Sequence, residues 1–108
     1  MKRGQIVSTV GCGDFSRKPR PSLVIQAELF NAFHPAITIC PITSFESGDS
    51  FYRVPVPRSD ENGLLADSEV EIDLIQAIRR ERLGDVIGMA SDEIMFSVDQ
   101  ALRRWLAL

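Results

Sequence analysis

The sequence is poor in the residues from which metal and redox centres are built. Its 108 residues include one histidine, His34, and two cysteines, Cys12 and Cys40, which lie far apart in the chain. The cysteines have no metal-ligand or redox spacing, so we expect free thiols in a reducing cytoplasm and neither a metal nor a cofactor. His34 stands between a phenylalanine and a proline, just before an apolar run. We interpret it as a structural residue rather than an acid–base group.

Long apolar runs are also missing. No stretch approaches the length of a membrane span, and the basic N-terminus is followed by Gly4 rather than by a signal-type apolar region. With 44% hydrophobic and 25% charged residues, the composition is that of a soluble globular protein. We expect a single domain over residues 1–108 that is cytoplasmic and does not contact a membrane.

Positive charge is scarce overall but unevenly placed. The formal net charge is −3. Residues 1–58 carry seven Lys or Arg against four acids, whereas residues 59–108 carry five against eleven. This asymmetry predicts a local basic face on an acidic body and argues against bulk binding of duplex nucleic acid.

Short apolar segments separated by turns predict a mainly β fold. The expected strands cover residues 5–10, 22–26, 36–42, 51–56, 68–74 and 85–89. Between the second and third strands, residues 27–33 are expected to form one or two helical turns, with Leu29, Phe30 and Phe33 covering the core.

The last third of the chain carries two clear periodic patterns. In residues 68–74 the apolar side chains of Val70, Ile72 and Leu74 alternate with the acids Glu71 and Asp73, which predicts a half-buried strand. After Ser91, a good N-cap, an amphipathic helix is expected. Its apolar stripe consists of Ile94, Val98, Ala101, Leu102, Trp105 and Leu106. The predicted fold class is α+β, a small, twisted, mostly antiparallel sheet or barrel closed by a C-terminal helix.

The most informative segment is the basic loop that runs into the second strand, Arg17-Lys18-Pro19-Arg20-Pro21. Pro19 and Pro21 fix their own φ angles and push the residues before them away from helix, so Arg20 is held extended. A guanidinium held in this way suits a phosphate oxygen. The alternative is an ordinary solvated loop.

A second candidate element is the strand end Pro41-Ile42-Thr43-Ser44, where two hydroxyl groups follow a dense apolar run. The hydroxyl groups of Thr43 and Ser44 can each donate a hydrogen bond to a ligand. The alternative is that these residues only form the turn.

These segments together resemble the MazF/PemK family of toxin endoribonucleases. That family opens with an R-G-x-I/V strand, here Arg3-Gly4-Gln5-Ile6, followed by R-P-x-L-V-I/V-Q and P-I/L-T-S motifs. Later segments match in the same order: residues 63–68, 82–88 and the helix from Ser91. The resemblance covers nearly the whole chain and implies a small SH3-like barrel of the CcdB/MazF type.

The resemblance also implies metal-independent cleavage of single-stranded mRNA by 2′-hydroxyl attack, which leaves a cyclic phosphate and a 5′-hydroxyl. The implied catalytic residues are Arg20, Thr43 and Asp73. The implied RNA-binding residues are Arg17, Lys18, Ser44, Glu71 and Gln76. Two of these depart from the family pattern: a subgroup has arginine where this chain has Glu71, and arginine is usual where it has Gln76.

The partners implied by the resemblance are single-stranded RNA, a second copy of the chain in a homodimer, and a cognate antitoxin with an acidic disordered tail. Two other classes stay open. One is a CcdB-like poison of DNA gyrase, with Trp105 near the end of the chain, although Trp105 on the apolar stripe is more simply core. The other is a non-catalytic SH3-like binding module.

Overall fold

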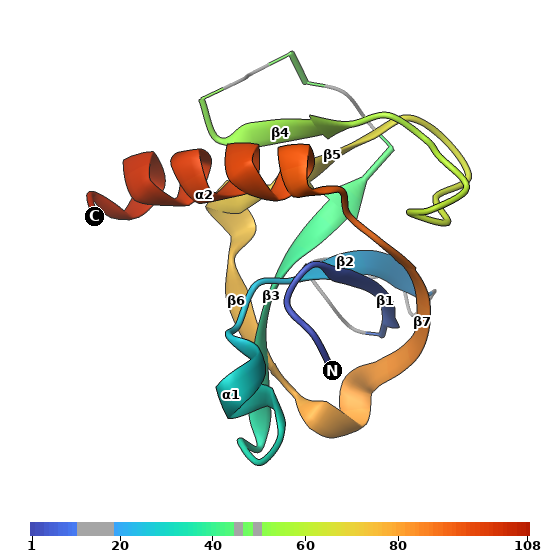
Figure 1. The fold of residues 1–108 in the computed structure, drawn as a ribbon, viewed down its shortest axis with the longest axis vertical. Coiled ribbons are helices and arrows are strands. Elements are labelled where there is room, and N and C mark those ends of the chain that lie inside the picture. Colours follow the sequence, from blue (N-terminus) through green and yellow to red (C-terminus); the bar gives the residue numbers. More distant parts are fainter. Residues whose placement is uncertain (11–18, 45–46, 49–50) are drawn as a thin grey trace.

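A computed structural model describes residues 1–10, 19–44, 47–48 and 51–108. Cys12, Arg17 and Lys18 lie outside these ranges. Seven strands form one antiparallel sheet, and a long helix follows the last strand (Figure 1). The strands are β1 (Gln5–Thr9), β2 (Arg20–Val24), β3 (Ala36–Thr43), β4 (Arg53–Val56), β5 (Ser68–Glu71), β6 (Gln76–Arg79) and β7 (Leu83–Met89).

The eight-residue strand β3 organises the sheet. Its first half pairs with β6, its middle with β2, and its last two residues, Ile42 and Thr43, with β5. Hydrogen-bonded neighbours follow the order β4-β5-β3-β2-β1-β7. Among the described residues no ladder joins β4 to β7, so the sheet curls without closing into a barrel. The predicted fold class is confirmed.

Both faces of the curled sheet are buried, because consecutive apolar residues of a strand point to opposite sides. Ile6 and Leu23 belong to a core cluster beneath the C-terminal helix. Their neighbours Val7 and Val24 belong to a second cluster, together with Ile37, Ile39 and Ile78. The unbroken apolar runs in β2 and β3 follow from this two-sided burial.

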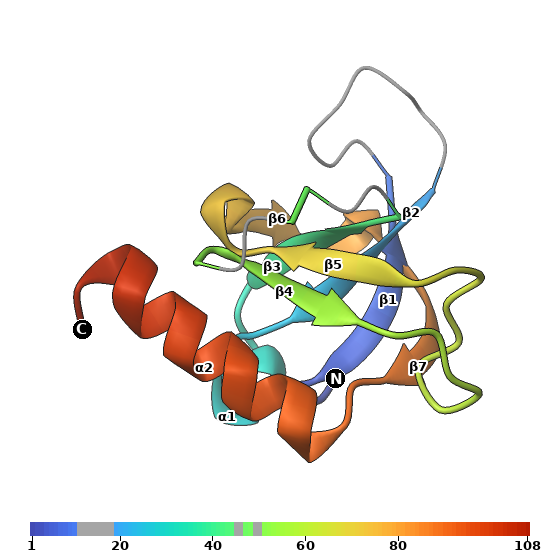
Figure 2. The ribbon, with the colours of Figure 1, turned by 90° about the horizontal axis from the view of Figure 1, so that it is seen from above.

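The C-terminal helix α2 (Asp92–Leu106) lies along β4 (Figure 2). Ser91 caps it as predicted, since its side chain accepts a hydrogen bond from the Ile94 amide at 3.2 Å. Val98 and Ala101 are fully buried. In the part of the chain that the structure describes, no helix is long and apolar enough to cross a membrane.

The prediction for residues 27–33 was wrong about the core. The helix α1 (Glu28–Asn31) is a single turn, and Leu29, Phe30 and Phe33 are 71%, 49% and 69% exposed. The buried residue is Asn31, whose amide donates hydrogen bonds to the carbonyls of Met1 and Gln26. One turn is too short to direct three apolar side chains to one face. The hydrogen bonds of Asn31 hold the turn in place instead.

Two further predictions about burial were wrong. The alternation of residues 68–74 stops at Glu71, because the chain turns into a 3-10 helix (Ile72–Leu74), and Leu74 is 40% exposed. A separate short strand, β6, then follows unpredicted. Trp105 and Leu106 are also about half exposed, since α2 extends past the sheet. Trp105 instead packs against Tyr52, with ring centroids 5.6 Å apart.

Candidate active site

Arg20 and Thr43 lie across from each other on neighbouring strands. Pairs in β2 and β3 run from Val24 opposite Ile39 to Ser22 opposite Pro41. Continuing this antiparallel register by two residues places Arg20 opposite Thr43. Arg20 is itself the first residue of β2, and it is exposed. The arginine of the proline-rich segment, Arg20, therefore lies beside the Thr43 hydroxyl at the end of β3.

These two residues line a pocket of about 320 Å³. Ser44 also lines it, so that one side of the pocket carries a guanidinium and two hydroxyls. The remaining lining residues are mostly apolar and come from β2, β3, β5, β7 and the loop between β4 and β5. They are Pro21, Ile42, Gly63, Leu64, Leu65, Ala66, Ser68 and Ile87.

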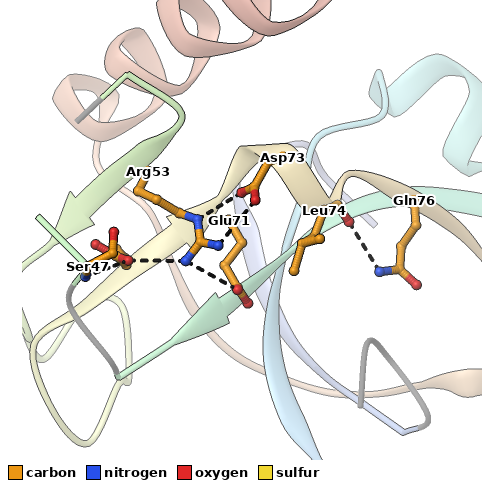
Figure 3. A network of polar contacts seen from close by, with 7 residues as sticks. Ser47, Arg53, Glu71, Asp73, Leu74 and Gln76 are labelled. Carbon is orange, nitrogen blue, oxygen red and sulfur yellow. Dashed lines mark hydrogen bonds and ion pairs between the residues drawn. The ribbon is translucent and has the colours of Figure 1, made fainter. Parts of the chain in front are cut away.

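A second polar cluster lies on β4, β5 and the 3-10 helix that follows β5, where one arginine contacts three acids (Figure 3). Arg53 Nε donates to Asp73 Oδ1 at 2.8 Å, and Arg53 Nη2 donates to Asp73 Oδ2 at 3.2 Å. Its Nη1 lies 3.3 Å from Glu69 Oε1 and 3.4 Å from Glu71 Oε2. All four side chains are at most 17% exposed. We call these residues the Arg53 cluster.

The pairing of β5 relates the Arg53 cluster to Arg20 and Thr43. Glu69 lies directly opposite Thr43, and directly opposite residues of an antiparallel pair share a face of the sheet. Glu71, two residues further along β5, is on that face as well. The acids do not line the pocket itself. They lie beside it, on the face that Arg20 and Thr43 share.

The charges in this region oppose one another at Glu71. Burial raises the pKa of the Glu71 carboxyl above its ordinary value, and the negative charges of Asp73 and Glu69 act in the same direction. The cations Arg53 and Arg20 act against this rise without cancelling it. Glu71 is thus a carboxylate with increased proton affinity. It is close enough to Arg20 for the two charges to interact.

The other residues that the sequence singled out are placed less centrally. Gln76 donates a hydrogen bond to the Leu74 carbonyl at 3.1 Å and contacts neither the pocket nor the Arg53 cluster (Figure 3). His34 is exposed, and its Nδ1 accepts a hydrogen bond from the Ala36 amide at 3.0 Å, which fits the structural interpretation. Arg17 and Lys18 lie outside the described residues.

Sequence reasoning missed Arg53, Glu69 and the loop that carries Leu65. A signal for the first two was present. Glu69, Glu71 and Asp73 recur at every second position, and three acids on one side of a strand need a cation nearby. In the described part of the chain, no group of three or more His, Cys, Asp or Glu residues has an arrangement that could hold a metal ion.

Comparison with known proteins identifies the family. The model for the PemK-like, MazF-like toxins of type II toxin–antitoxin systems matches residues 2–106. A probable endoribonuclease MazF of Mycolicibacterium smegmatis is 29% identical over 108 residues, which cover 100% of this chain and 98% of the relative. Endoribonuclease EndoA of Bacillus subtilis is 34% identical over 94 residues, 82% of this chain and 77% of the relative.

The fold agrees with this match. A mycobacterial endoribonuclease solved in complex with its cognate antitoxin superposes with a TM-score of 0.82 at 22% identity, over 100% of this chain and 96% of that one. The family match favours the endoribonuclease class over the CcdB-like alternative. The chain belongs to the PemK-like, MazF-like toxins of type II toxin–antitoxin systems.

Proposed function

We propose that this MazF-type endoribonuclease toxin cleaves single-stranded mRNA with sequence selectivity and without a metal, in the bacterial cytoplasm. The observation that supports this most directly is the placement of Arg20 opposite Thr43 at a pocket large enough for part of a nucleotide. The names of its two curated relatives, both endoribonucleases, support the same activity.

The proposed reaction uses the RNA's own 2′-hydroxyl as the nucleophile. Its oxygen forms a bond to the adjacent phosphorus while the bond from phosphorus to the 5′-oxygen breaks. The products are a 2′,3′-cyclic phosphate and a 5′-hydroxyl. Arg20 stabilises the negative charge that develops on the phosphate oxygens, because its planar guanidinium can donate two parallel hydrogen bonds to them. Thr43 donates a hydrogen bond to the same phosphate.

The reaction also needs a group that accepts the 2′-hydroxyl proton, and the Arg53 cluster offers two candidates. Asp73 has both carboxylate oxygens in hydrogen bonds to Arg53, which occupies acceptor sites that a proton acceptor would need. Among the described residues, Glu71 has one ion-pair contact, from its Oε2 to Arg53 Nη1 at 3.4 Å. Its pKa is also raised, so Glu71 is the better proton acceptor of the two. We assign the role of general base to Glu71. Asp73 is assigned the role of a positioning residue that holds Arg53 in place.

The remaining RNA contacts are assigned by position. Ser44 lines the pocket beside Thr43 and would hydrogen-bond the neighbouring nucleotide. Arg17 and Lys18, just before Arg20 in the sequence, are proposed as cations that position phosphates. Gln76 is kept as an outlying base contact.

The proposed partners follow from the family. As a toxin of a type II system, the chain would be neutralised by a cognate antitoxin whose acidic disordered tail folds on binding over the basic residues. The mycobacterial structure solved with its antitoxin supports such a partner. We further propose a homodimer, with RNA and antitoxin competing for one groove across the two subunits.

The activity is tested by incubating purified protein with a long RNA transcript and sequencing the 5′ ends of the fragments. We expect cuts at one short sequence, equally with and without EDTA. A 2′-O-methyl or 2′-deoxy group at the scissile nucleotide should block cleavage. Cleavage of that modified substrate would contradict the mechanism, and inhibition of gyrase with no RNA cleavage would contradict the activity itself.

A further inference from the structure

Leu65 is the most exposed large apolar side chain among the described residues, at 95%. It lies in the loop of residues 57–67 between β4 and β5, and it lines the same pocket as Arg20 and Thr43. Covering this side chain with a ligand would remove apolar surface from water, which is favourable. Beside it the pocket wall continues with Leu64, Ala66 and Ile87.

The loop that carries Leu65 is held rigidly by its own hydrogen bonds. The buried side chain of Asn62 accepts from the amides of Ser59 and Leu64 at 3.1 and 3.0 Å, and donates to the Pro57 carbonyl at 2.8 Å. Further along, the Asp67 carboxylate accepts from the Arg58 amide at 2.8 Å. Leu65 is therefore presented by a pre-organised loop.

Two glycines fix this loop against β7. A Cβ atom at Gly63, whose φ is +68°, would overlap the Ile87 carbonyl, and one at Gly88 would overlap the backbone of Asn62. The Met89 amide also donates to the Glu61 carbonyl at 2.9 Å. This close approach holds the loop that carries Leu65 beside Ile87, and both residues line the pocket.

The pocket thus combines two kinds of surface that match the two parts of a nucleotide. Arg20, Thr43 and Ser44 suit a phosphate, whereas Leu65 and Ile87 suit the apolar face of a base. Its volume of about 320 Å³ is at the lower end of the range for ligand pockets, about 300 to 1,000 Å³. A pocket of this size suits a single base.

We propose that this pocket is a single-base subsite, in which one RNA base next to the scissile phosphate packs against Leu65 and Ile87. The inference rests on the proposed ribonuclease activity and adds to it a residue, Leu65, that determines which nucleotide is held at the cleavage site. Leu65 acts in substrate binding and takes no part in the proton transfers.

Coupling between Leu65 and one base tests the subsite. The substrate is an RNA oligonucleotide that spans a mapped cleavage site, made intact and with a single abasic residue at each position in turn. We expect kcat/KM of the wild type to fall about tenfold at one position adjacent to the cut, the scale for losing the packing of part of a leucine. On intact RNA, the kcat/KM of the Leu65→Ala variant should be lower than that of the wild type by a similar factor, chiefly because KM rises.

The decisive measurement combines the Leu65→Ala variant with each abasic substrate. At that one position the losses from Leu65→Ala and from the missing base should not add, whereas at every other position they should. Leu29→Ala, which removes another exposed leucine outside the pocket, should behave as the wild type throughout. Additive losses at all positions, or a Leu65→Ala variant with unchanged kcat/KM, would overturn the subsite.

A binding measurement separates this inference from the proposed activity. Methyl NMR spectra are recorded while the four nucleoside 3′,5′-bisphosphates are titrated into the wild type. The Leu65 and Ile87 methyl signals should shift and those of Leu29 should not. Such shifts without any RNA cleavage would leave the subsite standing and reject the nuclease. Cleavage without these shifts would reject the subsite alone.

Discussion

Arg53 and Asp73 make a two-point contact, Nε to Oδ1 at 2.8 Å and Nη2 to Oδ2 at 3.2 Å, across the end of β5. The same guanidinium also lies within 3.4 Å of Glu69 and Glu71. One cation thereby compensates three partly buried acids, and it fixes where Glu71 lies relative to Arg20.

Removing this cation should destabilise the protein. Arg53→Met leaves three acids close together with their common partner gone, and breaking a buried ion pair in this way costs about 3 kcal/mol. Urea unfolding at pH 7 measures the loss. Arg79→Met, which removes an exposed arginine from β6, is the matched control and should change the unfolding free energy by less than about 0.5 kcal/mol. Equal effects of the two variants would show that the cluster is not a stabilising unit.

Arg20→Ala should lower kcat by at least about 100-fold, the scale for losing one pre-organised donor to developing charge. RNA affinity should fall far less. Arg20→Lys should not restore the rate, because a point charge does not replace the planar fork. Single-turnover cleavage with excess enzyme separates the two effects. Wild-type turnover of a folded Arg20→Ala protein would remove Arg20 from the active site.

Arg17→Ala and Lys18→Ala provide the contrast. Each should weaken RNA binding modestly and reduce the slope of log affinity against log salt concentration, as expected for cations that contact phosphates. Their kcat at saturating RNA should stay near that of the wild type. A large fall in kcat for either variant would place it with Arg20 instead.

Glu71 predicts a pH dependence of the rate. A base must be unprotonated to act, so kcat should rise with pH through the Glu71 pKa, which burial holds above the ordinary carboxyl range. Glu71→Gln should lose this rise and lower kcat by about 100-fold or more. The Asp73→Asn variant should lower the rate but keep the rise, since Glu71 remains. If the increase of kcat with pH is lost in Asp73→Asn but kept in Glu71→Gln, the general base is Asp73 and not Glu71.

The same residue predicts a pH dependence of stability. Because the folded-state pKa of Glu71 is raised, the folded protein holds this proton more tightly than the unfolded chain does. Its contribution to stability is therefore full below the unfolded pKa of about 4.3 and is lost as pH rises through the folded pKa. The unfolding free energy of the wild type relative to Glu71→Gln should fall across this window. A difference that grows with pH would show that Arg53 outweighs burial at this position.

The family resemblance, and not a local pattern, brought Arg20 and Thr43 together as a pair. Local patterns in the sequence were sufficient for the positions of most strands along the chain and for the capped helix. Each depends on proline, hydroxyl or apolar residues whose preferences act over a few positions. The exposure of Leu29, Phe30 and Phe33 was not predictable in this way. Their hydrophobicity suggests burial, but Asn31 fastens that turn through carbonyls brought close only by the folded chain.

The Arg53 cluster and the pocket wall were missed for a related reason. Arg53 meets its acids only through the pairing of β4 with β5, and Leu65 reaches the pocket only because Gly63 and Gly88 allow a loop to press against β7. The contact of Leu65 with the pocket leaves no periodic trace in the sequence. The alternating acids of β5 were the one available hint.

The two-sided burial of the sheet links the active site to the core. A slip of one residue between β2 and β3 would send Leu23 and Val24 into each other's cluster, since neighbouring positions belong to opposite cores. The same slip would separate Arg20 from Thr43. Every apolar contact that keeps the two strands aligned therefore also keeps the proposed catalytic pair in register. Misalignment of that pair would have to be accompanied by disruption of both cores.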